Sequence, residues 1–146
     1  MFYLTRRKTF NAAHRLHNPA WTAERNAAVF GKCNNANWHG HNYVLYVTVA
    51  GQPDPGTGFV MDAKVLSDLV EERVVGELDH RNLNLDVEWL ARDRQPTTEN
   101  IVAAIWQRLE PAVAAAGGAA RLHCVRLYET ENIYAEYYGP GGQPRP

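Results

Sequence analysis

The sequence predicts an α+β fold, with a four-stranded antiparallel sheet and two helices on one face. Two strand-like runs begin the chain, two segments with helical spacing follow, and two further strand-like runs come near the end. The order is therefore β-β-α-α-β-β. Within 146 residues this order fits one domain whose two helices cover the same face of a single sheet.

The first two strands are expected over residues 2–13 and 42–51. The second of these runs is rich in Val and Tyr, which favour extended structure. Residues 52–58 contain two prolines and two glycines beside an aspartate and therefore predict a turn. The last two strands, residues 121–129 and 132–138, are expected to form a hairpin.

The first helix is expected over residues 63–75, because Asp62 is a suitable N-cap and an apolar stripe follows it. The stripe consists of Val65, Leu66, Leu69, Val70 and Val74. Gly76 is expected at the C-terminal end of this helix.

The second helix is expected to begin at Thr97 or Thr98, either of which can act as the N-cap. Its apolar stripe consists of Ile101, Val102, Ile105, Trp106 and Leu109. Pro111 is expected to end or kink the helix, and Gly117 with Gly118 to close the segment.

Composition and charge limit the class of protein. One domain is expected over residues 1–138, followed by a Gly- and Pro-rich tail, residues 139–146, that is expected to be disordered. The net charge of −1 gives no basic surface for nucleic acid, and no apolar stretch is long enough to span a membrane. The start of the chain does not resemble a signal peptide. We therefore expect a cytoplasmic protein in which Cys33 and Cys124 are both reduced, with Cys124 as a packing residue.

A candidate metal site follows from the alternation of strand side chains. His39 and His41 are expected to point to the same face, and His14 ends the segment 10–14, which also has the pattern of extended structure. Three histidines with an open fourth position are typical of a catalytic zinc site. Cys33, six residues before His39, could instead be a fourth ligand that closes a structural site, and both interpretations stay open.

Five segments, taken together and in order, resemble one known family. They are residues 10–14, 31–43, 78–83, 97–100 and 128–132. They are similar to the 6-pyruvoyl-tetrahydropterin synthases, zinc enzymes of the tunnelling-fold superfamily, and the resemblance runs from about residue 3 to about residue 138. The 6-carboxytetrahydropterin synthases of queuosine biosynthesis share this fold, the zinc site and most of these motifs.

The resemblance implies roles for the reacting groups. It implies one zinc ion per subunit, held by His14, His39 and His41. It implies that Cys33 accepts a proton, and that Asp79 and His80 form a pair that relays protons and orients the base.

The resemblance also implies that Glu129 anchors the pterin, accepting two parallel hydrogen bonds from the aminopyrimidinone edge. Glu129 continues the alternation of Val125 and Leu127, where a lone carboxylate would need a partner. The resemblance assigns Glu129 to substrate affinity rather than to metal binding. Thr97 and Thr98 would line the pterin pocket in addition to capping the helix.

The reaction implied by the resemblance converts 7,8-dihydroneopterin triphosphate to 6-pyruvoyl-tetrahydropterin and triphosphate, without an external reductant. Mg²⁺ would accompany the triphosphate. A single sheet leaves exposed edges, and tunnelling-fold proteins join their sheets into barrels. The resemblance therefore implies a homo-oligomer, a hexamer, with active sites between subunits.

Two alternatives remain at this stage. In the carboxy-forming enzymes the cysteine typically stands four residues before the first histidine of His-Gly-His, whereas Cys33 stands six residues before His39. This spacing favours the pyruvoyl-forming group. A zinc-stabilised, non-catalytic pterin-binding oligomer is the second alternative, but binding alone does not need Cys33, Asp79 and His80. The chain also departs from the family's Asn-Gly before the first histidine, since Trp38 stands at the glycine position.

Overall fold

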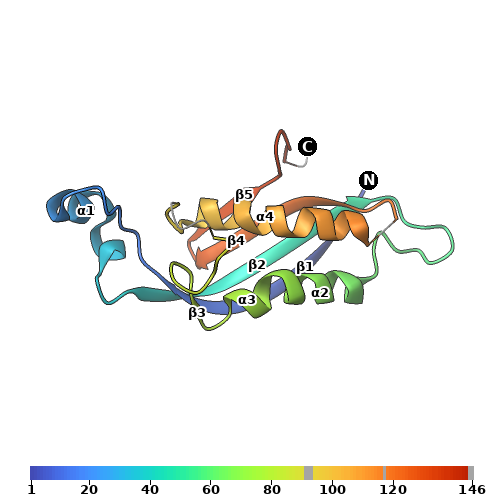
Figure 1. Cartoon of the computed structure of the whole chain (residues 1–146). Helices are drawn as coiled ribbons and strands as arrows, with labels where there is room; N and C mark the ends of the chain where they lie inside the picture. The colour runs from blue at the N-terminus through green and yellow to red at the C-terminus, as the bar shows by residue number, and fades with distance from the viewer. Residues whose placement is uncertain (91–93, 117, 145–146) are drawn as a thin grey trace.

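A computed structural model of the chain describes residues 1–90, 94–116 and 118–144. Its centre is a sheet with the strand order β3-β1-β2-β4-β5. The four long strands pair antiparallel with their neighbours; they are β1 (Phe2–His14), β2 (His39–Gly51), β4 (Arg121–Thr130) and β5 (Ile133–Tyr137). Helices cover one face of this sheet (Figure 1). The predicted α+β fold, with its four antiparallel strands, is confirmed.

The short strand β3 (Arg81–Asn82) was not predicted. It pairs parallel to β1 at Ala12 and Ala13. Two residues are too few to show any hydrophobic periodicity, so no sequence pattern could predict this strand. The pairing holds the segment that carries Asp79 and His80 against β1.

The first helical region continues further than predicted. It comprises α2 (Ala63–Val70), a π-helical turn (Glu71–Val75) and α3 (Gly76–Leu78). Asp62 accepts hydrogen bonds from two backbone N–H groups of the first turn, so the predicted N-cap is confirmed. The prediction that the helix ends at Gly76 is wrong. Leu78 is fully buried in the core, and its burial favours a helical path that continues to this residue.

The second predicted helix is α4 (Thr98–Ala115), with Thr97 as its N-cap. Pro111 was predicted to end or kink this helix; it lies inside the helix, so it does not end it, and the kink stays a prediction. A proline inside a helix costs about 3 kcal/mol. Full burial of Val113 in the core offsets part of this cost, since burying such a side chain contributes about 1.5–3 kcal/mol. Gly117 lies outside the described residues.

The connection between β1 and β2 contains two further elements that were not predicted. They are α1 (Ala23–Phe30) and a 3₁₀ turn, η1 (Gly31–Asn34). Figure 1 shows α1 projecting from one end of the molecule. Trp21 stacks on Phe30 with ring centroids 5.7 Å apart, and the Arg25 guanidinium lies 4.1 Å from the Trp21 ring. Between His14 and His39 the chain leaves the sheet, forms α1 and then η1, and returns to the sheet at β2.

The core lies between the sheet and α2 and α4. Alternate residues of three strands enter it, for example Phe10 from β1, Leu45 from β2 and Leu127 from β4, all exposed by 2% or less. Ile105 of α4 is also fully buried. The same alternation continues along these strands to four polar residues at one end of the sheet: His14, His39, His41 and Glu129.

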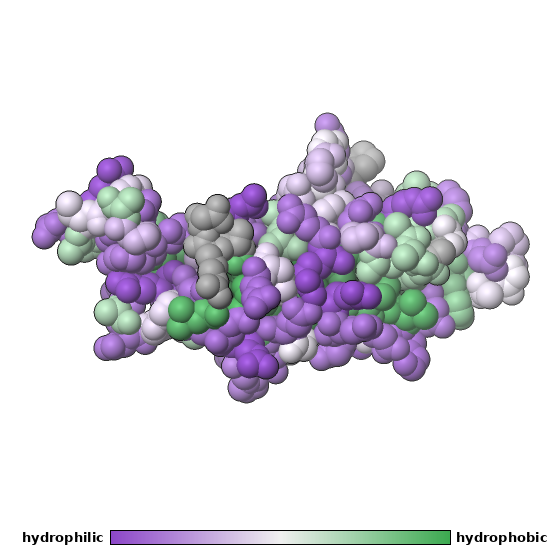
Figure 2. All heavy atoms as spheres, in the orientation of Figure 1, coloured by the Kyte–Doolittle hydropathy of each residue, from purple (hydrophilic) through white to green (hydrophobic). Residues whose placement is uncertain are grey.

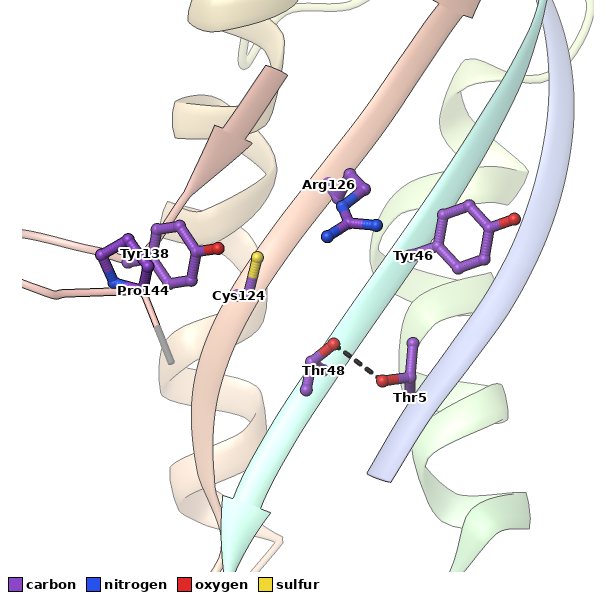
Figure 3. A pocket seen from close by; sticks show the side chains of 7 residues that line it. All are labelled: Thr5, Tyr46, Thr48, Cys124, Arg126, Tyr138 and Pro144. Atoms are coloured by element: carbon purple, nitrogen blue, oxygen red, sulfur yellow. Dashed lines mark hydrogen bonds between the residues drawn. The ribbon is translucent and has the colours of Figure 1, made fainter. Parts of the chain in front are cut away.

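Within the described part of the chain, no helix lies over the opposite face of the sheet (Figure 3). Figure 3 shows a cavity of about 340 Å³ on this face, with the helices behind the strands. Cys124 lines this cavity beside Tyr138 and Pro144 and is buried. Neither Cys124 nor Cys33 forms a disulfide bond.

The surface of the helix side is mainly hydrophilic, with smaller hydrophobic patches (Figure 2). Among the helices of the described residues, none has the length and apolar character needed to cross a membrane. Residues 139–144 follow β5 without helix or strand. The predicted domain boundary at residue 138 and the predicted disorder of the tail remain predictions.

Candidate metal centre and active site

The three predicted histidines meet at one end of the sheet. His14 is the last residue of β1, and its backbone partner in the antiparallel register is His39, the first residue of β2. His41 lies two residues further along β2 on the same face. Together with Glu129 of β4, each of these side chains offers a ligand atom, and all four atoms lie within 4.8 Å of one another.

His14 is held in one orientation by a backbone carbonyl. Its Nδ1 lies 2.9 Å from the carbonyl oxygen of Pro96, and the side chain is 1% exposed. A carbonyl oxygen can only accept, so Nδ1 carries the proton and Nε2 keeps its lone pair for the cluster. This is the usual second-shell arrangement of a metal-binding histidine.

His39 and His41 are also prepared to act as neutral ligands. Burial lowers the pKa of both imidazoles below its usual value, which favours the neutral form that binds metals. The Nε2 atoms of all three histidines are buried without a hydrogen-bond partner among the described residues. Buried nitrogen atoms of this kind need a partner, and a divalent metal ion would supply one. The donor set therefore fits a metal ion.

Glu129 approaches the same nitrogen atoms from β4. Its Oε1 lies 3.2 Å from Nε2 of His14 and 3.0 Å from Nε2 of His41. Its Oε2 accepts a hydrogen bond of 2.7 Å from the hydroxyl of Thr98, the first residue of α4. The neighbouring His14 imidazole and the Thr98 hydroxyl lower the pKa of Glu129 to about 2, against the opposing effect of burial, so the carboxylate is ionised at neutral pH.

Cys33 lies on η1, which the residues after β1 hold in place. The backbone N–H of Leu16 donates to the Cys33 carbonyl at 2.9 Å. Arg15 donates to the backbone and side-chain oxygens of Asn34 at 3.0 and 3.1 Å, and the His17 ring lies 2.8 Å from the same side-chain oxygen. The supporting roles of Arg15 and His17 had no signal in the sequence.

Tyr43 packs against two histidines of the cluster, and its hydroxyl is within electrostatic reach of Cys33. Its ring contacts those of His14 and His41, with centroids 6.2 and 5.6 Å apart. Burial raises the pKa of the Tyr43 hydroxyl, and the charges of Glu129 and Cys33 raise it further. Both groups therefore lie within electrostatic reach of this hydroxyl. The sequence analysis treated Tyr43 only as a strand residue.

Asp79 and His80 form a pair on the other side of β1. Asp79 Oδ2 lies 2.9 Å from His80 Nδ1, and Asp79 Oδ1 accepts from the backbone N–H of Asn11 at 2.8 Å. That backbone hydrogen bond lowers the pKa of Asp79. His80 is 79% exposed at its side chain and has a positive φ of 59°. Within the described chain, neither residue bonds to Cys33 or to the cluster.

Two open cavities flank His41. One, of about 620 Å³, is bordered by His41, Asn11 and His80. The other, of about 710 Å³, is bordered by His41 and Glu129.

Thr97 and Thr98 differ in position. Thr97 caps α4, and its hydroxyl accepts from the backbone N–H of Asn100. Thr98 is buried and donates to Glu129. The Pro96 carbonyl, which orients His14, was missed because a backbone oxygen leaves no mark on the sequence.

The departure at Trp38 has a conformational consequence. Trp38 has a φ of 69°, in the left-handed region that favours glycine. The backbone thus keeps a glycine-like conformation directly before His39, although the residue is a tryptophan.

Comparisons with known proteins agree with this geometry. A family model described as 6-pyruvoyl tetrahydropterin synthase matches residues 3–140. The chain belongs to this family. It is 43% identical over 136 residues to the human 6-pyruvoyl tetrahydrobiopterin synthase, covering 93% of this chain and 90% of the human protein.

The similarity extends to a solved structure and to the neighbouring group. The structure of the Caenorhabditis elegans 6-pyruvoyl tetrahydropterin synthase superposes with a TM-score of 0.87 at 35% identity, covering 95% of this chain and 96% of that one. A 6-carboxy-5,6,7,8-tetrahydropterin synthase from Synechocystis is 32% identical over 148 residues, covering 99% of this chain and 98% of that protein. The identity is higher with the pyruvoyl-forming group.

Proposed function

We propose that this protein is a zinc-dependent 6-pyruvoyl-tetrahydropterin synthase, a lyase that converts 7,8-dihydroneopterin triphosphate to 6-pyruvoyl-tetrahydropterin and triphosphate. The observation that carries the proposal is the cluster of three histidine side chains beside Glu129, in a chain of this family. Three histidines without a cysteine among them favour a catalytic zinc site over a closed structural one.

The residues of the chain divide the work. His14, His39 and His41 would hold the zinc ion, which when bound acts as a Lewis acid toward the side-chain oxygens of the substrate. Cys33, held near this site by η1, would accept a carbon-bound proton. Mg²⁺ would accompany the triphosphate.

Glu129 would hold the pterin ring. Its carboxylate is ionised and can accept two parallel hydrogen bonds from the N–H groups of an aminopyrimidinone. The hydroxyl of Thr98 orients this carboxylate. Thr97 would contribute to the pocket wall near the start of α4.

Asp79 and His80 would serve this chemistry in an oligomer. In one chain they lie across β1 from the cluster, on an exposed part of the surface. A homo-hexamer with active sites between subunits would bring the pair of one subunit to the Cys33 of another. The edge strands β3 and β5, together with the sheet face that carries no helix, supply the surfaces for such an assembly. Two cysteines outside any disulfide bond agree with a cytoplasmic location.

The carboxy-forming reaction is the main alternative, since the same residues and substrate would serve it. The relative from Synechocystis supports keeping it in view. The six-residue spacing from Cys33 to His39 supports the pyruvoyl-forming reaction. A non-catalytic pterin-binding oligomer is less well supported, because the family is one of enzymes.

Product identification tests the proposal. The purified protein is incubated with 7,8-dihydroneopterin triphosphate, Mg²⁺ and no reductant, and the products are identified by mass spectrometry. We expect 6-pyruvoyl-tetrahydropterin and triphosphate. Accumulation of 6-carboxytetrahydropterin would assign the protein to the alternative group, and unchanged substrate would favour a binding module.

A further inference from the structure

Glu129 lies where a fourth metal ligand would lie. The three histidines come from β1 and β2, whereas Glu129 reaches the same point from β4. We propose that Glu129 is a fourth ligand of the metal in the pterin-free enzyme and leaves the metal when a pterin binds. This inference rests on the metal centre of the proposed function and gives one of its residues a second role.

The distances support coordination. Metal–nitrogen and metal–oxygen bonds of a tetrahedral zinc site are about 2.0–2.2 Å long, so neighbouring ligand atoms lie about 3.3–3.6 Å apart. Oε1 of Glu129 lies 3.2 Å from Nε2 of His14 and 3.0 Å from Nε2 of His41. These separations are slightly shorter than two edges of such a tetrahedron, so the three atoms are close enough together to bind one metal ion. The ligand atom of His39 lies within 4.8 Å of the other three.

The second carboxylate oxygen is already bound elsewhere. Thr98 donates its hydroxyl to Oε2 at 2.7 Å, and Thr98 is buried at the start of α4. This leaves Oε1 alone to face the imidazoles. The hydrogen bond therefore orients Glu129 for coordination through one oxygen, as outer-shell partners do in metal sites.

Coordination and pterin binding compete for the same carboxylate. An aminopyrimidinone edge takes both oxygens in a bidentate pair, whereas the metal takes Oε1. Glu129 cannot do both at once. On pterin binding the bond between the metal and Oε1 breaks and two hydrogen bonds to the carboxylate form, which leaves the fourth metal position open. By linkage, the pterin and the Glu129–metal bond must then weaken each other.

Zinc affinity of the pterin-free protein tests the first part. Glu129→Gln keeps the size of the side chain and its ability to bond to Thr98, but it loses the anionic ligand. We expect its zinc affinity, measured by competition with a chromogenic chelator, to fall at least about tenfold, the lower end of the loss seen when even an outer-shell partner is removed. Glu131→Gln, at an exposed carboxylate two residues away, should keep the affinity of the unaltered protein.

His39→Ala separates this inference from the proposed function. If His39→Ala binds zinc as tightly as the unaltered protein, the metal centre itself is wrong. If His39→Ala loses zinc but Glu129→Gln binds it with unchanged or higher affinity, only the fourth-ligand inference fails. Glu129 would then merely pair with the imidazoles in the absence of metal.

A second measurement, on the unaltered sequence, tests the exchange. The protein is loaded with Co²⁺ in place of zinc, and its visible absorption is recorded with and without 6-methylpterin. This probe has the aminopyrimidinone edge but no side-chain hydroxyl that could bind the metal. We expect the absorption to change as Glu129 leaves, and an unchanged spectrum at saturating 6-methylpterin would overturn the exchange.

Discussion

The two ends of the helix-covered sheet face are built from the same strands but have different chemistry. At one end, Leu45 and Leu127 are fully buried beneath the helices. At the other end, the same alternation presents His41 and Glu129. The backbone geometry of the strands is the same at both ends, since each strand places every second side chain on this face. What differs is the chain segment that covers them.

The apolar end is covered by the sides of α2 and α4, which offer further apolar groups. The polar end is covered by the segment that leads into α4. This segment offers the Pro96 carbonyl to His14 and the Thr98 hydroxyl to Glu129. The difference teaches that strand periodicity chooses the position of a site, and that the covering segment orients its ligands.

The largest effect should come from removing a ligand at the polar end. We expect His39→Ala to bind much less than one zinc per subunit after purification without added metal, and to lose turnover. Elemental analysis measures the zinc. His123→Ala is the matched control and should keep its zinc, because His123 contacts Tyr3 and Tyr138 instead of the cluster. Full zinc content in His39→Ala would contradict the assignment of the polar end.

Cys33→Ala should leave the metal in place and reduce catalysis. General-base catalysis contributes a factor of about 10² to 10⁴, so turnover should fall at least about 10²-fold. The zinc content and the oligomeric state should stay unchanged. Steady-state kinetics and elemental analysis measure the two effects. Cys124→Ala, which removes the other cysteine of the chain, should retain turnover. Loss of zinc from Cys33→Ala would instead indicate a closed structural site.

At the apolar end a substitution should affect stability alone. Leu45 is fully buried, and Leu→Ala substitutions at such sites lower the free energy of unfolding by about 2–5 kcal/mol. We expect Leu45→Ala to lose stability by this amount in denaturant titrations and to bind one zinc per folded subunit. A loss of zinc from the folded variant would show that the two ends are coupled.

The smallest effect concerns the strained residue before the polar end. Trp38→Gly and Trp38→Ala both remove the indole, but only glycine adopts the φ of 69° without strain. We expect the glycine variant to be more stable than the alanine variant by about 1 kcal/mol in thermal or denaturant unfolding. Equal stability of the two variants would show that the backbone strain is relieved elsewhere.

The sequence predicted the position of the site better than its support. The alternation placed His39 and His41 on one face, and it placed Glu129 on the face of Val125 and Leu127, as observed. These are period-two relations within single strands and need no tertiary information. His14 joined them because β1 and β2 pair in the register that sets it opposite His39.

The remaining parts depend on contacts between distant segments. The Pro96 carbonyl, the Arg15 contact with Asn34 and the two-residue strand β3 have no local pattern that predicts them. The extension of α4 beyond Pro111 follows from burial of Val113, which overrides the local preference. Predictions from local sequence patterns were wrong where tertiary packing contributed more free energy than the local conformational preference.

The most direct test of the account asks whether the polar end carries out the elimination. The protein is stripped of metal with a chelator, and triphosphate release from 7,8-dihydroneopterin triphosphate is measured before and after addition of one equivalent of zinc. We expect release to be lost on stripping and restored by zinc in the unaltered protein, and not restored in His39→Ala. Full triphosphate release by the stripped protein would contradict the claim that His14, His39 and His41 form a catalytic metal centre.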